Sequence, residues 1–91
     1  PPAVREARAP AAQRAGKMSF NDRRELEALP ERIAALEAEQ AALHARLADP
    51  ALYQEAAHEV AQVNARAQAL DAEIEAAMAR WEDLETRAAG G

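Results

Sequence analysis

Cysteine is absent from this sequence of 91 residues, and glycine and aromatic residues are rare. Without cysteine the chain can form neither disulfides nor thiolate metal sites. It holds three Gly and one each of Trp, Tyr and Phe, and a chain of this size buries only a modest core. We therefore expect no catalytic residue, no metal site and no cofactor within these residues.

Longer functional patterns are missing as well. No GxxxxGK[ST] phosphate loop occurs, so the chain has no ATP-binding motif of its own and is not expected to be an enzyme. It has no run of about 18 apolar residues that could span a bilayer, and no signal-peptide core. These absences predict a soluble, cytoplasmic protein without membrane contacts. The sequence begins at Pro1 instead of Met, which suggests a piece of a longer chain.

Good helix formers make up most of the sequence. Ala, Leu, Glu, Arg and Gln dominate, and β-branched residues are scarce, which is typical of a coiled coil. Residues 1–16 differ, because they contain three Pro and six Ala and no larger apolar side chain except Val4. Such a segment buries too little surface to offset its ordering entropy. We interpret residues 1–16 as a disordered, flexible linker and residues 17–91 as the folded part.

Two runs of residues recur at alternating spacings of three and four, which is the pattern of coiled-coil helices. Gln40 is the one polar member of the first run. The first run is Leu26, Leu29, Ile33, Leu36, Gln40, Leu43 and Leu47, and the second is Val60, Val63, Ala67, Leu70, Ile74, Ala77, Trp81, Leu84 and Ala88. Between the runs the heptad register slips by one residue, which is what a corner between two helices requires.

The sequence predicts an all-α fold, a two-helix antiparallel coiled-coil hairpin. Asp49 before Pro50 is a helix stop, with proline at the first position of the next helical turn. We expect one helix over residues 19–48, a corner over 49–53 and a second helix over 54–88.

Charges beside the apolar seam favour the antiparallel arrangement. Folding at the corner brings together flanking positions of opposite sign, and each pair is expected to select register more than to stabilise the fold. The four pairs are Glu25 with Arg80, Arg32 with Glu73, Glu39 with Arg66, and Arg46 with Glu59. A parallel homodimer would also form some complementary pairs, so the charges favour a monomeric hairpin without being decisive.

Three local features refine this prediction. Ser19 followed by Asp22, or Asp22 followed by Glu25, predicts a capping box at the start of the first helix. Pro30 removes one backbone hydrogen bond and predicts a bend, because the heptad phase continues across it. Trp81 is expected in the core in preference to stacking on a base.

The cations that the pairing leaves over gather at one end of the hairpin. The net charge is −5, yet residues 1–24 carry six basic and two acidic side chains. A cluster of Lys and Arg can displace counterions from a phosphate backbone, although it can also be an ordinary solubilising surface. The predicted DNA-binding residues are Arg14, Lys17, Arg23, Arg24 and Arg87.

Four segments carry a family resemblance: Lys17 to Phe20, Arg24 to Pro30 with Ile33, Ala48 to Pro50 with Tyr53, and Arg80 to Glu82 with Leu84 and Glu85. Together they resemble the C-terminal domain of the Uup-type ABC-F ATPases, over about residues 14–91. The family's basic entry segment corresponds to Lys17 and Arg24. Asn21 stands where family members often have Lys, and Met18 and Phe20 stand where Leu and Tyr are usual.

The resemblance implies a small DNA-binding hairpin that follows two ATP-binding cassettes without membrane spans. It implies ATP and Mg as cofactors of the parent protein, and duplex or branched DNA and the parent's own cassettes as partners. It also implies roles in DNA repair or at the ribosome. Two alternatives remain open: an arm that faces the ribosome and its RNA, or a protein-interaction coiled coil with contacts at its helix ends or at Leu52 and Tyr53.

Overall fold

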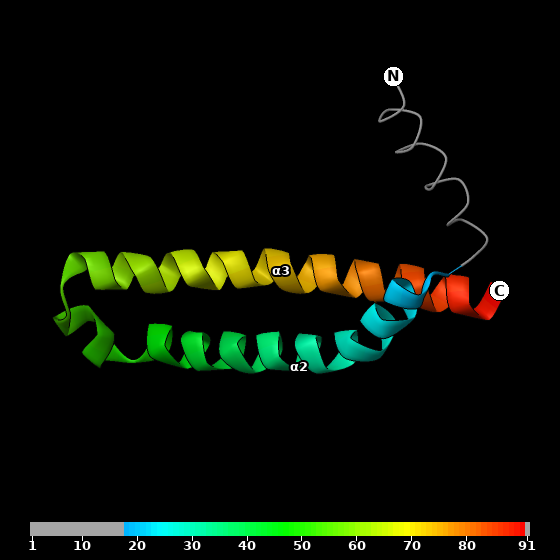
Figure 1. Ribbon diagram of the computed structural model, residues 1–91. Coiled ribbons are helices and arrows are strands. Elements are labelled where there is room, and N and C mark those ends of the chain that lie inside the picture. The colour runs from blue at the N-terminus through cyan, green and yellow to red at the C-terminus, as the bar shows by residue number, and fades with distance from the viewer. Residues whose placement is uncertain (1–17, 91) are drawn as a thin grey trace, which may run out of the picture.

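The computed structural model describes residues 18–90, so the predicted linker over residues 1–16, with Arg14, and also Lys17 lie outside the described residues. Its elements are helix α2 (Phe20–Ala48), the short 3₁₀ helix η1 (Pro50–Gln54) and helix α3 (Ala57–Gly90). Figure 1 shows α2 and α3 side by side and antiparallel, joined at the end where η1 lies. The predicted all-α hairpin of two helices is confirmed.

The start of α2 has the first of the two predicted capping boxes. Ser19 is the N-cap, and its hydroxyl accepts a hydrogen bond from the Asp22 backbone N–H at 3.0 Å. The Asp22 carboxylate in turn accepts from the Ser19 backbone N–H at 3.2 Å. These two bonds satisfy backbone donors that the first helical turn leaves without partners.

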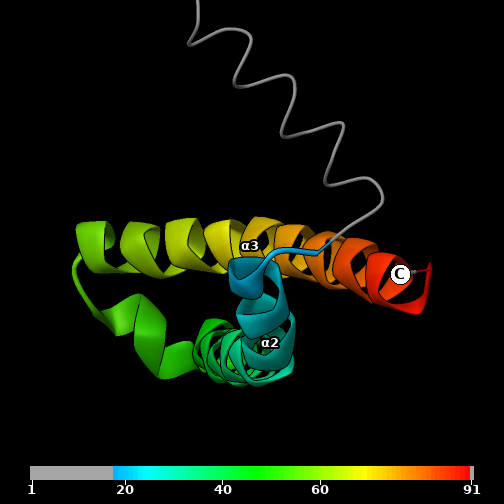
Figure 2. The same ribbon diagram turned by 45° about the vertical axis from the view of Figure 1, so that its right-hand side comes forward.

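Pro30 lies inside α2, which continues through it as one helix. Proline removes the hydrogen bond to the carbonyl four residues earlier and crowds the preceding turn, so it bends a helix. Figures 1 and 2 show this bend: the first turns of α2, drawn in blue and cyan, lean across toward α3, whereas the rest of α2 runs alongside it. The expected bend is confirmed, and it positions the first turns of α2 against the last turns of α3.

The corner is longer than the sequence indicated, because a 3₁₀ helix follows the helix stop. Asp49 accepts a hydrogen bond from the Ala51 N–H at 2.9 Å, and Pro50 takes the first position of η1. Leu52 turns inward and is only 3% exposed, and the Tyr53 hydroxyl donates to the Leu47 carbonyl at 2.7 Å. As a result α3 begins at Ala57, three residues later than expected.

The core is a single seam between α2 and α3. Two of its side chains, Leu70 and Leu84, are completely buried. The buried apolar residues are Leu29, Leu36, Leu52, Val63, Ala67, Leu70, Ala77 and Leu84. Trp81 is partly buried against this core, which confirms its predicted packing role. Phe20, by contrast, has 73% of its surface exposed.

Candidate nucleic-acid interface

Of the predicted DNA-binding residues, Arg23, Arg24 and Arg87 lie at the open end of the hairpin, which comprises residues 19–25 at the start of α2 and residues 80–87 of α3. The two segments are held together by five charged side chains that we call the open-end cluster: Asp22, Glu25, Arg80, Asp83 and Arg87. The capping box and the bend at Pro30 position the α2 side, and the register of the core seam positions the α3 side.

Asp22 is the centre of the open-end cluster and the one charged residue among the buried residues of the described chain, with 6% of its surface exposed. One carboxylate oxygen accepts from Arg80 at 3.2 Å, and the other accepts from Arg87 at 3.0 Å. The hydrogen bond from the Ser19 backbone N–H lowers the pKa of Asp22, and the charges of the two arginines lower it further against the opposing effect of burial. The carboxylate therefore remains ionised, and two cations compensate its charge.

Arg80 links the cluster back to α2. Its guanidinium donates two bonds of 2.9 Å to the carboxylate of Glu25, which is the planar, bidentate arrangement that arginine favours. The hydrogen bonds from Arg80 lower the pKa of Glu25, and those to Glu25 raise the pKa of Arg80. This is one of the four predicted pairs, and it is confirmed.

Arg87 differs from the expectation that its side chain is available to a ligand. Only 10% of the side chain is exposed, and the guanidinium is paired with Asp22 at 3.0 Å and with Asp83 at 3.4 Å. The residue does return to the open end, as expected. It points inward because Asp22, at the start of α2, is a buried charge that needs a partner.

Arg23 and Arg24 lie on the outer surface of the first turns of α2, and both are exposed. The guanidinium carbon of Arg24 lies 5.8 Å from the centre of the Phe20 ring. That distance is within the range of a cation–π contact. Of the predicted site residues, these two are the ones that the structure describes as solvent-facing, while Arg14 and Lys17 belong to the residues it does not describe.

The remaining arginines of the described chain are engaged along one side of the hairpin. Arg66 donates two bonds of 2.8 Å to Glu39 and one of 2.8 Å to Glu73, and Arg32 approaches Glu73 at 4.0 Å. Bonding to Glu39 raises the pKa of Arg66 and lowers that of Glu39. The predicted pairs of Arg66 with Glu39 and of Arg32 with Glu73 are confirmed.

The fourth predicted pair, Arg46 with Glu59, is wrong. Arg46 bonds Glu55 at 3.3 Å, and Glu59 lies beside His58 at 3.8 Å. The longer corner explains the change, because η1 delays the start of α3 and returns Glu55 toward the end of α2.

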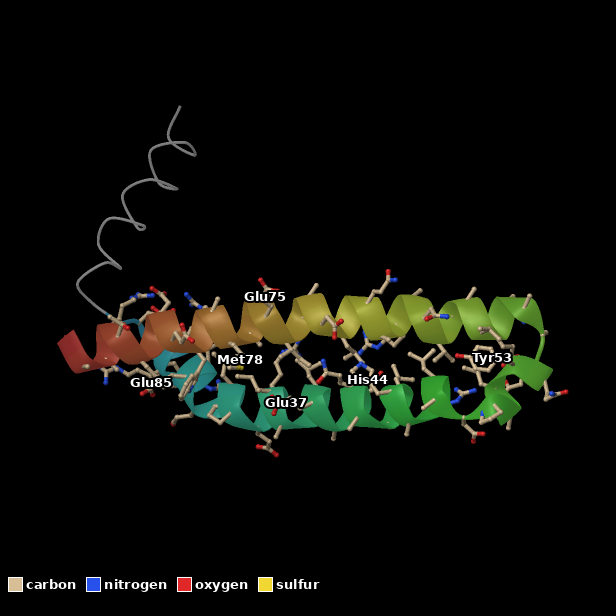
Figure 3. All side chains as sticks on the ribbon, turned by 180° about the vertical axis from the view of Figure 1, so that it is seen from behind. Glu37, His44, Tyr53, Glu75, Met78 and Glu85 are labelled. Atoms are coloured by element: carbon tan, nitrogen blue, oxygen red, sulfur yellow. The ribbon has the colours of Figure 1, made fainter. Side chains whose placement is uncertain are left out.

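Outside the open end the described surface is mainly acidic. Residues 26–79 include three arginines and ten acidic residues, and Figure 3 shows Glu75 extending from α3 away from α2. Within the described residues 18–90 no group of three or more His, Asp or Glu side chains is arranged to hold a metal ion. Neither of the two long helices in this range is apolar enough to cross a membrane.

Sequence reasoning missed the open-end cluster and the Phe20–Arg24 contact. A signal for the cluster was present: Asp22 falls on a core position of the heptad frame, and Arg87 has the uncharged Met18 as its register partner. A charge on a core position requires an opposite charge nearby. The exposure of Phe20 also had a signal, because its heptad position, two residues before the core position of Asp22, lies on the outer side of the helix.

Known proteins are similar to this chain over most of its length. The family described as ABC transporter C-terminal domain matches residues 17–86. The chain is 42% identical over 72 residues to a protein of Haemophilus influenzae named ATP-binding protein Uup-like, with 78% of the chain and 16% of that protein covered. It is equally identical over 72 residues to the ATP-binding protein Uup of the same organism, covering 78% of the chain and 11% of that protein.

A third relative is the ATP-binding protein Uup of Escherichia coli, at 35% identity over 97 aligned residues, with 99% of the chain and 15% of that protein covered. The chain thus spans less than a fifth of the length of these relatives. No solved structure matches it.

Proposed function

The chain belongs to the family of ABC transporter C-terminal domains and is of the Uup type, and on this premise we propose that it is the DNA-binding accessory domain of an ABC-F ATPase. In this proposal the cassettes of the parent protein bind ATP and Mg and perform the hydrolysis. The hairpin contributes no catalytic residue and contacts the phosphate backbone of DNA at its open end.

The observation that carries the proposal is the distribution of arginine partners. Five of the seven arginines in the described chain form ion pairs with carboxylates, whereas Arg23 and Arg24 form none. Both are exposed and adjacent, and the residue before the described chain is Lys17. Unpaired cations that follow one another on a surface can replace the counterions of a phosphate backbone without first breaking an internal contact.

The open-end cluster supports the proposal because it compensates the acidic charges next to Arg23 and Arg24. Asp22 is the acidic residue nearest to Arg23 in sequence, and its charge is turned inward between Arg80 and Arg87. It therefore offers little repulsion to an approaching phosphate. Arg87 enters the proposal in this supporting role, since its guanidinium already binds two carboxylates.

Fluorescence anisotropy of labelled duplex and branched DNA, titrated with the full chain from low to physiological salt, tests the proposal. Four cations, Arg14, Lys17, Arg23 and Arg24, predict a slope of log affinity against log salt of about −3 to −4. Replacing Arg23→Gln and Arg24→Gln together is expected to flatten that slope by about two. Gln62→Glu with Gln68→Glu lowers the net charge by the same amount on exposed positions of α3 and serves as the matched control.

Equal loss of binding in both double variants would mean that only overall charge matters and would contradict a defined interface. A structured RNA competitor distinguishes the ribosome-facing alternative: if RNA displaces DNA at much lower concentration than duplex DNA does, the open end is an RNA contact. The protein-interaction alternative predicts that the chain binds neither DNA nor RNA. Because Leu52 is buried, its contacts would be at the helix ends or at Tyr53.

A further inference from the structure

Phe20 is the most exposed large apolar side chain of the described residues, with 73% of its surface open to solvent. Phe20 contributes little to the core, whereas Trp81 packs against the core. Tyr53, the other exposed ring, lies at the corner and has its hydroxyl bonded to the Leu47 carbonyl; Figure 3 shows it at the end of the hairpin where the helices are joined. Phe20 lies at the opposite, open end, and its ring has no hydroxyl that could bond to the backbone.

The guanidinium of Arg24 lies over the Phe20 ring, with its carbon 5.8 Å from the ring centre. The two residues are four apart on α2, so their side chains lie over the same part of the helix surface. A cation over an aromatic face is attracted by its negative quadrupole, which restricts how the ring can turn. One face of the ring is thereby held against Arg24, and its large exposed area leaves the other face accessible.

The surroundings of the ring match the two parts of a nucleotide. Arg23 and Arg24 are exposed and carry no ion pair, so they suit phosphates. An accessible aromatic face suits a base, because every base has a π-face of its own. Asp22, which precedes Arg23, is buried and bonded to Arg80 and Arg87. Glu25, which follows Arg24, is bonded to Arg80. Both negative charges are therefore compensated and oppose the approach of an anion only weakly.

We propose that Phe20 is a stacking platform for an unpaired base, and that Arg23 and Arg24 hold the phosphates beside that base. This inference rests on the proposed function and narrows its ligand to single-stranded nucleic acid, or to the single-stranded part of a branched one. In an intact duplex both faces of each internal base are already stacked on neighbours. A blunt duplex can therefore use the arginines along its whole length, whereas the base faces that it offers to the ring are limited to its two terminal pairs.

The test compares a labelled single-stranded oligonucleotide of DNA with a blunt duplex that carries the same number of phosphates, using anisotropy at one low salt concentration. The unmodified chain is expected to prefer the single strand. Phe20→Leu, which keeps an apolar side chain without a π-face, is expected to weaken single-strand binding about tenfold and to leave duplex binding unchanged. Phe20→Tyr restores a ring and is expected to restore the preference. Tyr53→Leu is the matched control and is expected to change neither affinity.

Circular dichroism of each variant reports that the hairpin is folded, and Phe20 can be replaced without opening the core because it lies outside it. If Phe20→Leu binds the single strand as tightly as the unmodified chain while the Arg23 and Arg24 double variant does not bind, the stacking platform is wrong and the phosphate interface stands. If the folded, unmodified chain binds neither probe, both proposals are wrong. A single-stranded RNA of the same sequence tests whether the base belongs to DNA or to RNA. If the chain binds RNA more tightly than DNA and Phe20→Leu abolishes this binding, the stacking platform is correct and its ligand is RNA.

Discussion

At the scale of single residues, Asp22 combines two roles that rarely coincide. It completes the capping box of α2, and it receives the guanidinium groups of Arg80 and Arg87 from α3. A buried carboxylate with fewer partners would destabilise the fold, because taking a charge out of water is costly. With a backbone N–H and two cations as partners it stays ionised, and it ties the start of α2 to the end of α3.

The first prediction concerns the pH dependence of stability at Asp22. Its pKa is lower in the folded chain than the ordinary value of 3.8, as are those of Glu25 and Glu39 relative to 4.5. Because the pKa of each carboxylate is lower in the folded chain, its ionised form stabilises the fold fully at pH values above the ordinary pKa. This stabilisation is lost as the pH falls through the folded-state pKa. The melting temperature is therefore expected to fall below about pH 4. Asp22→Asn is expected to melt lower than the unmodified chain at pH 7 and to lose less on acidification.

Thermal unfolding followed by circular dichroism at pH 7 and pH 3 makes this comparison. Asp71→Asn is the control, because it neutralises an exposed carboxylate that accepts a hydrogen bond from Gln40 at 2.8 Å. If Asp22→Asn and Asp71→Asn show the same acid sensitivity, the special role of Asp22 is contradicted.

At the scale of elements, α2 is two straight segments joined at Pro30. The bend turns the first segment toward α3, whereas the second follows α3 along the seam (Figures 1 and 2). A straight α2 would follow one line along its whole length, and its first turns would not lean across α3. Pro30 therefore lowers the stability of α2 but turns the open end toward α3.

The second prediction concerns the effect of Pro30 on helix stability and on the open-end cluster. Pro30→Ala restores a backbone hydrogen bond and removes the clash of the proline ring, which is worth up to about 3 kcal/mol in a helix interior. We expect more helical signal in circular dichroism and a higher free energy of unfolding. We also expect that Asp22→Asn destabilises the Pro30→Ala background less than the original chain, because a straighter α2 withdraws Asp22 from Arg80 and Arg87.

Denaturant unfolding of the two single variants and the double variant measures this coupling. Glu31→Ala, an exposed neighbour on the same helix, is the control for adding an alanine. Additive effects of Pro30→Ala and Asp22→Asn would show that the bend does not position the cluster.

At the scale of the whole molecule, the hairpin closes its seam within one chain. Leu70 and Leu84 are completely buried by residues of the same chain. One side of the seam is lined by the ion pairs of Arg32, Arg66 and Arg80. A second copy would therefore meet a mainly acidic surface, and like charges oppose association.

The third prediction is that the chain is monomeric. Sedimentation equilibrium is expected to give a mass of 9.8 kDa at every protein concentration. A repeat at high salt, where repulsion between acidic surfaces is screened, is expected to give the same result. A mass that rises with concentration would show that the seam exchanges partners between chains.

The sequence by itself determined the features that depend on local periodicity and on the regular rise of a helix. Heptad spacing located the seam from Leu26 to Leu84, and Ser19 and Pro50 marked a helix start and a helix stop. Because both helices have the same rise per residue, one corner position was enough to align charges far apart in sequence. Three of the four predicted ion pairs are present for this reason, and the pair nearest the irregular corner is the one that differs.

Only the tertiary structure decided which side chains meet where the helices no longer run straight alongside each other. The 3₁₀ helix at the corner gave Arg46 the partner Glu55, and the first turns of α2 brought Asp22 to Arg80 and Arg87, 58 and 65 residues away. These contacts depend on how far the chain bends at Pro30 and turns at the corner, and the spacing of apolar residues does not encode either angle. For the same reason the structure, and not the pattern, separated the inward Arg87 from the outward Arg23 and Arg24.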